Sequence, residues 1–362
     1  MKSCISLITF IFSLFCLGQN LTIRQTGGRS EKCANQNTDG KKSQNVRIVF
    51  YNVENLYDPY DDTTKMDNEF TSSGAKHWSY SRFQTKLNHL SKTLLSIGGW
   101  EPPPIVGLCE VENRYVLNKL IYQTPLMKFK YRIIHHDSPD SRGIDVIMLY
   151  RPEKFTVLSS KYIEVHFPFD TVAQTRDILM VKGKVFLNDT IILFVNHWPS
   201  RRGGYSESQP RRIFVAGLLR SKIDSIFRID KHPNIIIMGD FNDEPDKESL
   251  AKVLNAIPFK KDEKPDDLVN LMYSGEIRWN EGTIKYQGQW SIFDQFIVSG
   301  NLVSASDDTQ TMLAEAHIFK GDFLTEKDDR NLGEKLKRTY AGPRYLGGFS
   351  DHLPIYLDLK RN

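Results

Sequence analysis

The chain contains few cysteines for its length, and neither sign of charge dominates. Only four of its 362 residues are cysteines, and two of them, Cys4 and Cys16, lie in the first apolar stretch. This is unlike a small, cysteine-dense secreted domain, so no structural disulfide is implied. The net charge of +4 is small for this length. Because nucleic-acid-binding surfaces carry clustered Lys and Arg, the total charge neither indicates nor excludes a polyanionic partner.

Long hydrophobic runs are also missing, apart from one at the N-terminus. Residues 5–17 are mostly apolar and follow Lys2, and Gly18 offers a cleavage point. This pattern is typical of a secretory signal peptide, and the run is shorter than the roughly 20 residues that span a bilayer. We therefore expect a signal peptide over 1–18, export to the periplasm or the extracellular space, and no stable membrane insertion. Lipid attachment at Cys16 is the alternative that we disfavour.

No internal repeat and no later composition shift divide the rest of the chain. Residues 19–45 are polar and lack periodicity, which is typical of a flexible leader. We expect one folded catalytic domain over 46–362, acting as a monomer.

Short β-rich runs alternate with helical patterns along this domain. Apolar stripes at helical spacing run through 83–97 and 213–227, and Ser206, Ser208 and Pro210 are expected to cap and open the second helix. Such stripes between buried strands predict a layered α/β fold. Near-continuous apolar runs of strand length occur at 46–51, 105–109, 145–150, 190–196, 234–239, 296–299 and 353–359.

Polar side chains stand where these predicted strands end. Asn52 follows the first run, Glu110 the second, His197 the fourth and Asp240 the fifth. Groups at the ends of neighbouring buried strands meet at the rim of the sheet, where α/β proteins bind ligands. Any one Asn or Asp could simply start a turn. Glu110 and His197 are not turn formers, however, and the recurrence indicates a functional site.

The chemistry of this set is that of oxygen and imidazole ligands. The sequence has no thiolate cluster and no serine in a nucleophile elbow. Carboxylates such as Glu110 and Asp351 suit Mg²⁺, Mn²⁺ or Ca²⁺ rather than a closed zinc site. Carboxylates, neutral amides and histidines around such a cation are what hydrolysis of a phosphate ester requires.

The order of the motifs resembles the endonuclease/exonuclease/phosphatase superfamily, in particular an exported, bacterial-type, deoxyribonuclease-like member. The resemblance implies a four-layered α/β sandwich, in which two mixed β-sheets pack face to face with helices outside. It covers nearly the whole domain, and the order and spacing of the motifs make it specific. The motifs are YNVENL, GLCEVEN, SRGIDVIMLY, NHWPSRRGG, MGDFNDEP, FDQFIVS and FSDHLPI.

The resemblance also implies metal-binding positions. Glu110 resembles the principal metal ligand, and Asn52 stands beside it as a ligand or a phosphate contact. Asp351 resembles a second metal ligand or an orienting carboxylate. Mg²⁺ is the cation we expect, with Mn²⁺ or Ca²⁺ as alternatives.

Catalytic roles follow from the same resemblance. Asp240 and Asn242 resemble the pair that activates or positions the nucleophile, and His197 matches a phosphate-contacting position. Asp294 and His352 resemble a buried carboxylate–imidazole dyad. Either Asp240 or His352 could be the general base, and the sequence leaves this choice open.

Arginines near these motifs are candidates for binding substrate. Arg201 and Arg202 follow the histidine motif, with Arg211 and Arg212 just beyond, and Arg142 stands in a motif of its own. Guanidinium groups hold phosphates in a bidentate manner, so we expect Arg142, Arg201 and Arg202 to contact the substrate. A solvated loop and helix face is the alternative interpretation for the group around Arg201.

Three functions are compatible with this pattern. The favoured one is an exported, metal-dependent phosphodiesterase that hydrolyses nucleic acid. The second is a lipid or small-molecule phosphoesterase similar to secreted sphingomyelinases. The third is a non-catalytic binding module, which we would expect to have lost one of the motif residues, and all of them are present.

Overall fold

The computed structural model describes residues 44–99, 101–186, 188–260, 263–273, 281–303 and 312–361. The predicted signal peptide and residues 19–43 of the predicted leader lie outside this part. Within it, the first strand begins at Gln44, slightly before the domain start expected from the sequence. No helix of the described part is long and apolar enough to cross a membrane.

Two large sheets form the centre of the domain. The first has six strands in the order β14-β19-β1-β2-β4-β3, and the second has seven in the order β5-β6-β7-β8-β13-β10-β9. The first sheet contains β1 (Gln44–Leu56), β2 (Ile105–Val111), β3 (Arg132–Ile134), β4 (Asp145–Tyr150), β14 (Met312–Ile318) and β19 (Ile355–Arg361). The second contains β5 (Thr156–Ile163), β6 (Ile178–Val185), β7 (Asp189–His197), β8 (Ile235–Asp240), β9 (Ala256–Pro258), β10 (Leu268–Asn270) and β13 (Asp294–Ser299).

Helices and short ribbons complete the domain. The α-helices are α1 (Tyr80–Gly98), α2 (Arg114–Tyr122) and α3 (Tyr205–Ile229). Short helical turns are η1 (Asn68–Phe70), η2 (Pro125–Phe129), η3 (Ser249–Leu254) and η4 (Gly300–Leu302). Two-stranded ribbons pair β11 (Ile284–Tyr286) with β12 (Gln289–Ser291), β15 (Thr325–Lys327) with β16 (Glu334–Leu336), and β17 (Tyr340–Ala341) with β18 (Arg344–Tyr345).

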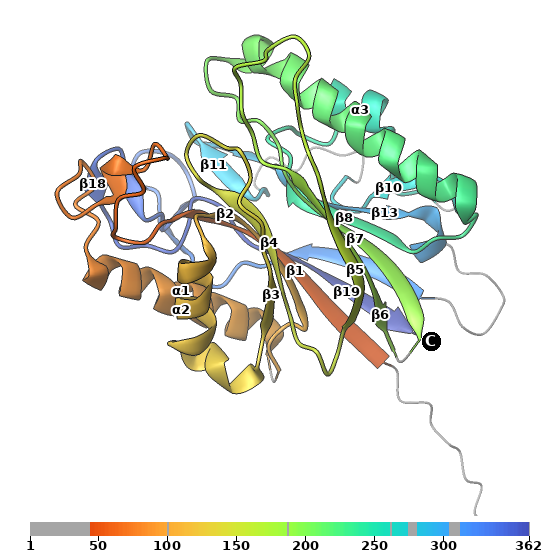
Figure 1. The fold of residues 1–362 in the computed structure, drawn as a ribbon, viewed down its shortest axis with the longest axis horizontal. Helices are drawn as coiled ribbons and strands as arrows, with labels where there is room; N and C mark the ends of the chain where they lie inside the picture. Colours follow the sequence, from red (N-terminus) through yellow and green to blue (C-terminus); the bar gives the residue numbers. More distant parts are fainter. Residues whose placement is uncertain are drawn as a thin grey trace, which may run out of the picture. The chain divides into compact units, whose positions relative to one another are not determined.

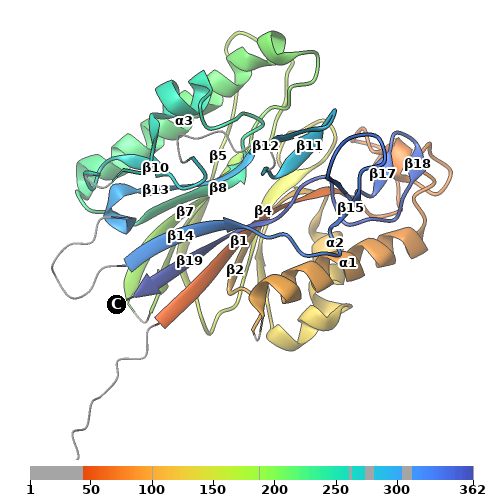
Figure 2. The same ribbon diagram turned by 180° about the vertical axis from the view of Figure 1, so that it is seen from behind.

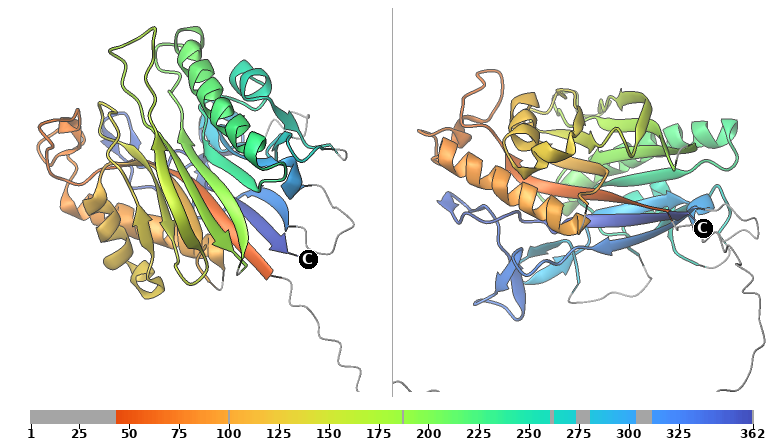
Figure 3. Two further views of the ribbon diagram at one scale, coloured as in Figure 1. Left: turned by 45° about the vertical axis from the view of Figure 1, so that its right-hand side comes forward. Right: turned by 90° about the horizontal axis from the view of Figure 1, so that it is seen from below.

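The two sheets pack face to face with helices outside, as Figures 1 and 2 show from opposite sides. Both are mixed, since β1 runs parallel to β2 and antiparallel to β19, while β8 runs parallel to β7 and antiparallel to β13. Helices α1 and α2 lie over the first sheet and α3 over the second, an arrangement also seen in the two views of Figure 3. The four-layered α/β sandwich predicted from the sequence is confirmed.

The side chains of β1 point alternately to the two faces of the first sheet, and this shows how the sequence specifies the layers. Ile48 and Phe50 point into the core between the sheets, whereas Val49 and Tyr51 pack on the side of α1 and α2. Successive side chains of a strand face opposite sides, so a strand buried on both faces must be apolar at every position. The continuous apolar run 46–51 therefore becomes a central strand.

The start of α3 differs from the sequence expectation. Its N-cap is Gly204 rather than one of the serines, and Pro210 lies inside the helix. The Ser208 hydroxyl donates to the Gly204 carbonyl at 2.7 Å, so it binds back onto the helix instead of capping it. A helix interior loses one backbone hydrogen bond at proline, and α3 nevertheless continues to Ile229 with its buried face packed on the second sheet.

Candidate active site

The ends of three neighbouring strands of the second sheet bring polar residues together. His197 on β7 is the register partner of Asp240 on β8, and Asp240 is also the partner of Asp294 on β13. From the first sheet, the Asn52 side-chain amide donates to Asp240 Oδ2 at 3.0 Å. This hydrogen bond crosses between the sheets, so the site lies where both of them end.

The backbone is strained at two of the predicted site residues. Glu110 has φ +63° and sits where the pairing register of β2 with β4 shifts between Cys109 and Val111. Asn242 has φ +51°, and its backbone N–H donates to Asp240 Oδ1 at 2.9 Å. Left-handed backbone is costly for a residue such as Glu and persists where the surroundings impose it, often at functional sites. The bulge at Glu110 redirects its side chain at the strand end.

His352 lies between two buried carboxylates. Its Nδ1 is 2.6 Å from Asp294 Oδ2, and its Nε2 is 3.8 Å from Asp240 Oδ2. Burial opposes the charged imidazolium, but Asp294 and Asp240 outweigh it and hold the pKa of His352 well above its usual range. His352 therefore carries a proton at neutral pH, and Asp294 fixes its orientation.

His197 has the opposite character. Its Nε2 lies 3.7 Å from Asp240 Oδ2 and 3.9 Å from Glu110 Oε1. Burial, together with Arg176, Arg142 and His352, lowers the pKa of His197 well below its usual range, so this imidazole is neutral. In the described part of the chain its Nδ1 is buried without a hydrogen-bond partner.

Asp240 links the two histidines. Burial raises the pKa of this carboxyl group to about 6, with Asp294 adding to the shift and His352 opposing it. A base that titrates close to neutral pH is suited to accept a proton during catalysis. The hydrogen bonds from Asn52 and from the Asn242 backbone hold both of its oxygens in place.

Hard oxygen donors lie on the side of the first sheet. Glu110 Oε2 accepts the N–H of Asn55 at 2.9 Å, while Oε1 faces His197. The Asn52 carboxamide and the Asp240 carboxylate are joined beside it. Carboxylate and amide oxygens are the ligands that Mg²⁺ and Ca²⁺ prefer. These residues therefore fit a hard divalent cation, with Glu110 as its carboxylate ligand.

Asp240, Asp294 and His352 form another group of potential metal ligands, with one ligand atom of each within 4.8 Å of the others. In this group, His352 Nδ1 and Asp294 Oδ2 are already joined by a short hydrogen bond. This bond would have to be given up before all three residues could hold a metal ion, whereas Glu110 makes no hydrogen bond to either of the other two carboxylates. The predicted ligand Asp351 accepts a hydrogen bond from Arg338 at 2.9 Å, and its role toward a metal stays a prediction.

Arg201 is engaged in contacts within the protein, and its contact with a substrate stays a prediction. Its guanidinium donates to Asp243 at 2.8 Å, to Glu244 and to the backbone carbonyl of Asn242. Arg212 likewise faces Asp243 at 3.0 Å, and both side chains are fully buried. These two arginines hold the loop after β8 through ion pairs and hydrogen bonds. Arg142 and Arg202, in contrast, line a cavity beside the site.

Sequence reasoning missed a buried cation beneath the site. Lys86 on α1 donates to Thr339 Oγ1 and to the Phe349 carbonyl, both at 2.6 Å. Burial lowers the pKa of Lys86 to about 8, although Glu54 opposes the shift. The signal was available, because Lys86 lies three residues after Phe83 and four before Leu90, on the buried face of the helix.

Fold and site together define an α/β sandwich hydrolase with an acidic and histidine-containing centre. The sequence profile of the Endonuclease/Exonuclease/phosphatase family matches residues 47–361, and the chain belongs to this family. Its members are phosphoesterases and nucleases. A comparison with curated protein sequences finds no match.

Solved structures share the fold at low sequence identity. A Bacteroides thetaiotaomicron protein of this family has a TM-score of 0.54 at 15% identity, over 89% of this chain and 99% of its own. D. rerio TDP2 humanized by 14 mutations has a TM-score of 0.51 at 17% identity, over 87% and 98%. A mannosyl-6-phosphatase from B. thetaiotaomicron has a TM-score of 0.52 at 15% identity, over 87% and 99%. At these identities the similarity shows the fold alone.

Proposed function

We propose that this protein is an exported, divalent-metal-dependent phosphodiesterase that hydrolyses nucleic acid. The observation that carries the proposal is the chain of contacts from Asn52 through Asp240 to His352 and Asp294, buried at the ends of strands from both sheets. It places a carboxylate that titrates near neutral pH beside a protonated imidazole and a neutral one. This combination suits proton transfer and stabilisation of charge at phosphorus.

In this mechanism Asp240 accepts a proton from the attacking water, whose oxygen bonds to phosphorus as the bond from phosphorus to the leaving oxygen breaks. The leaving oxygen takes a proton from solvent. The protonated His352 donates a hydrogen bond from Nε2 to a phosphoryl oxygen, and Asp294 keeps its ring in the required orientation. His197 contacts the phosphate as a neutral imidazole, and Asn242 positions Asp240 through its backbone N–H. Mg²⁺ held by Glu110, with Asn52 beside it, would offset the negative charge that develops on the phosphorus oxygens.

The positive charge around the site supports a polyanionic substrate, such as a nucleic acid. Arg142 and Arg176 are close enough to lower the pKa of His197, and Arg202 lies on the loop that follows this histidine. Positive charge beside a reaction centre attracts and orients a polyanionic substrate.

A phosphomonoesterase acting on sugar phosphates is the second candidate. The observation in its favour is the similar fold of the mannosyl-6-phosphatase. The same carboxylate and imidazole groups would serve a monoester, because the attack of water on phosphorus needs the same base and the same charge stabilisation.

A substrate panel separates the two candidates. Purified protein with Mg²⁺ is assayed against plasmid DNA, RNA, sphingomyelin, mannose 6-phosphate and bis-nitrophenyl phosphate, with Asp240→Asn as the inactive control. We expect hydrolysis of nucleic acid, loss of activity in EDTA and recovery with Mg²⁺ or Mn²⁺. Faster turnover of mannose 6-phosphate than of nucleic acid would favour the phosphatase, and undiminished turnover in EDTA would refute the metal requirement.

Export is a separate part of this proposal, supported by the N-terminal sequence. Cleavage after Gly18 would give a mature chain that begins at Gln19. Intact-mass measurement of protein recovered outside the cytoplasm tests this. A chain that retains Met1, or a lipid-modified Cys16, would contradict simple secretion.

A further inference from the structure

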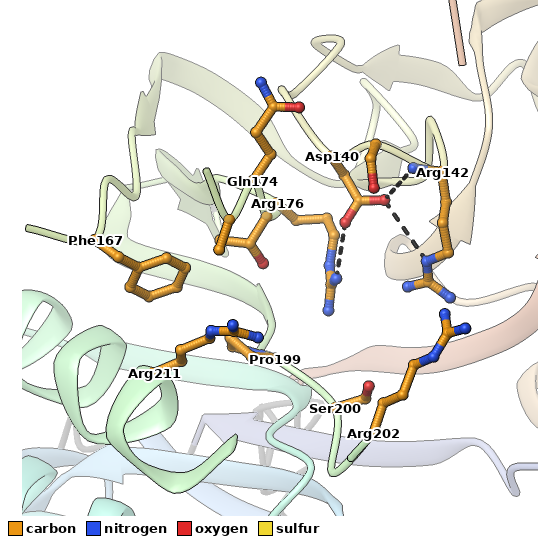
Figure 4. A pocket seen from close by; sticks show the side chains of 12 residues that line it. Asp140, Arg142, Phe167, Gln174, Arg176, Pro199, Ser200, Arg202 and Arg211 are labelled. Atoms are coloured by element: carbon orange, nitrogen blue, oxygen red, sulfur yellow. Dashed lines mark hydrogen bonds and ion pairs between the residues drawn. The ribbon is translucent and has the colours of Figure 1, made fainter. Parts of the chain in front are cut away.

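A cavity lined by arginines lies beside the candidate active site. Its volume is about 230 Å³, and a water molecule fills roughly 30 Å³ of liquid, so a tetrahedral anion fits. Figure 4 shows Arg142, Arg176, Arg202 and Arg211 around it, with Asp140 at one side. Four guanidinium groups and one carboxylate leave an excess of positive charge among the lining residues.

The arginines differ in how free they are. Arg176 is held in a buried ion pair with Asp140 at 3.0 Å, and Arg211 is paired with Asp170 at 2.5 Å. Arg202 is exposed, and within the described residues it makes neither an ion pair nor a hydrogen bond. Arg202 therefore has unused hydrogen-bond donors and lies near other positively charged groups. An anion that accepts several hydrogen bonds, such as a phosphate, would satisfy these donors and balance the charge.

The cavity is linked to the reaction centre through one backbone carbonyl. The backbone carbonyl of Trp198 accepts from Arg176 at 2.8 Å and from the Asn242 side chain at 3.0 Å. Trp198 directly follows His197, and Arg142 of the cavity lowers the pKa of that histidine. A group bound in the cavity is therefore a near neighbour of a phosphate at the active site.

We propose that this cavity, bounded by Arg142, Arg176, Arg202 and Arg211, binds a second phosphate group of the substrate, adjacent to the one that is hydrolysed. The proposal rests on the proposed phosphoesterase activity and narrows its substrates to compounds with at least two phosphates. The ion pairs of Arg176 and Arg211 position those side chains, and Arg202 supplies the charge that only the substrate neutralises.

Matched substrates test this proposal. Thymidylyl-thymidine has one phosphate, and its 5′-phosphorylated and 3′-phosphorylated forms have two with the same bases. We expect Arg202→Gln to raise KM about tenfold for a two-phosphate form, the value of one charged hydrogen bond, and to leave KM for the one-phosphate compound unchanged. Arg211→Gln should act in the same direction but less. Glucose 1,6-bisphosphate and glucose 6-phosphate form a second pair that identifies a sugar substrate.

Arg228→Gln is the matched control. Arg228 lies near the end of α3, the helix that also carries Arg211. It is exposed, and among the described residues its hydrogen bond is to the nearby Ser225. Equal KM changes for both members of every pair, or the same change in Arg228→Gln, would overturn the second-phosphate site and leave the proposed function standing. If wild type hydrolyses no phosphoester, the proposed function fails instead.

Phosphate binding by the cavity can be tested even if the wild type hydrolyses no phosphoester. Calorimetry with inorganic phosphate should detect two binding events in wild type and in Arg228→Gln, and one in the Arg202→Gln/Arg211→Gln double variant. Identical titrations of the wild type and the double variant would show that the cavity does not hold phosphate. Circular dichroism confirms that each variant is folded.

Discussion

The core between the sheets and the rim where the strands end are built from the same strands but bury different kinds of side chain. The core is a cluster of buried hydrophobic side chains that includes Phe50, Met238 and Phe296. The rim, a few residues further along, holds the buried ionisable groups Asp240 and Asp294. Burying apolar area stabilises a fold, whereas burying charge costs free energy that hydrogen bonds only partly offset. Stability and chemistry are therefore separated along each strand.

The largest effect that we expect is on catalysis, from a substitution at the rim, and it tests whether rim and core have separate roles. Asp240→Asn should lower kcat by ~10²–10⁴, the range for a general base, because the amide cannot take a proton from water. The melting temperature should fall only slightly, because removing a buried charge offsets the acceptor that Asn52 loses, and the amide oxygen can still accept from Asn242. Kinetics and calorimetry on the same preparation measure both. A large drop in stability would mean that rim and core are not separable here.

The core should respond in the opposite way. Phe296→Ala removes a fully buried ring from between the sheets and should lower the free energy of unfolding by about 3–5 kcal/mol. The fraction that remains folded at low temperature should keep its turnover number. Phe259→Ala, at a position that is 52% exposed, is the control and should change neither property. Denaturant unfolding and active-site-normalised kinetics test this.

The core was predictable because its signal is local. Each apolar run quoted from the sequence lies largely within a strand, and both apolar stripes lie within α1 and α3. Among the strands that the apolar runs do not mark, β5 is an edge strand, and most of its side chains are exposed. An edge strand of mixed polarity lacks the continuous apolar pattern that marks a central one. Its place in the sheet depends on pairing with β6, which no local pattern encodes.

At the rim, the positions of the residues were predictable but their partners were not. Asn52, Glu110, His197, Asp240, Asp294 and His352 are brought to the strand ends, as the motifs indicate. Arg201, in contrast, follows the histidine motif, and its neighbours in sequence predict a contact with substrate phosphates. Asp243 and Glu244, which hold it, are 42 and 43 positions away, so only the folded chain reveals the pairing. Long-range ion pairs leave no spacing signal in a single sequence.

The smallest expected effect concerns a buried carboxyl group next to the rim. Burial raises the pKa of Glu112 to about 8, and the charges of Asp58 and Asp67 add to the shift. Between the ordinary carboxyl pKa near 4.5 and about 8, the folded chain binds a proton that the unfolded chain has lost, so stability should fall as pH rises through this window. Glu112→Gln should flatten that decline and raise the melting temperature at pH 8. Identical pH profiles for variant and wild type would contradict it.

The most direct test of the rim as a catalytic unit is a double-mutant cycle on Asp294 and His352, whose facing atoms are 2.6 Å apart. His352→Ala and Asp294→Asn should each lower kcat for a phosphodiester by ~10²–10⁴. The double variant should be little worse than either single one, because the carboxylate acts only through the imidazole. Multiplying losses, or a His352→Ala enzyme within a factor of a few of wild type, would show that this pair is not the working centre.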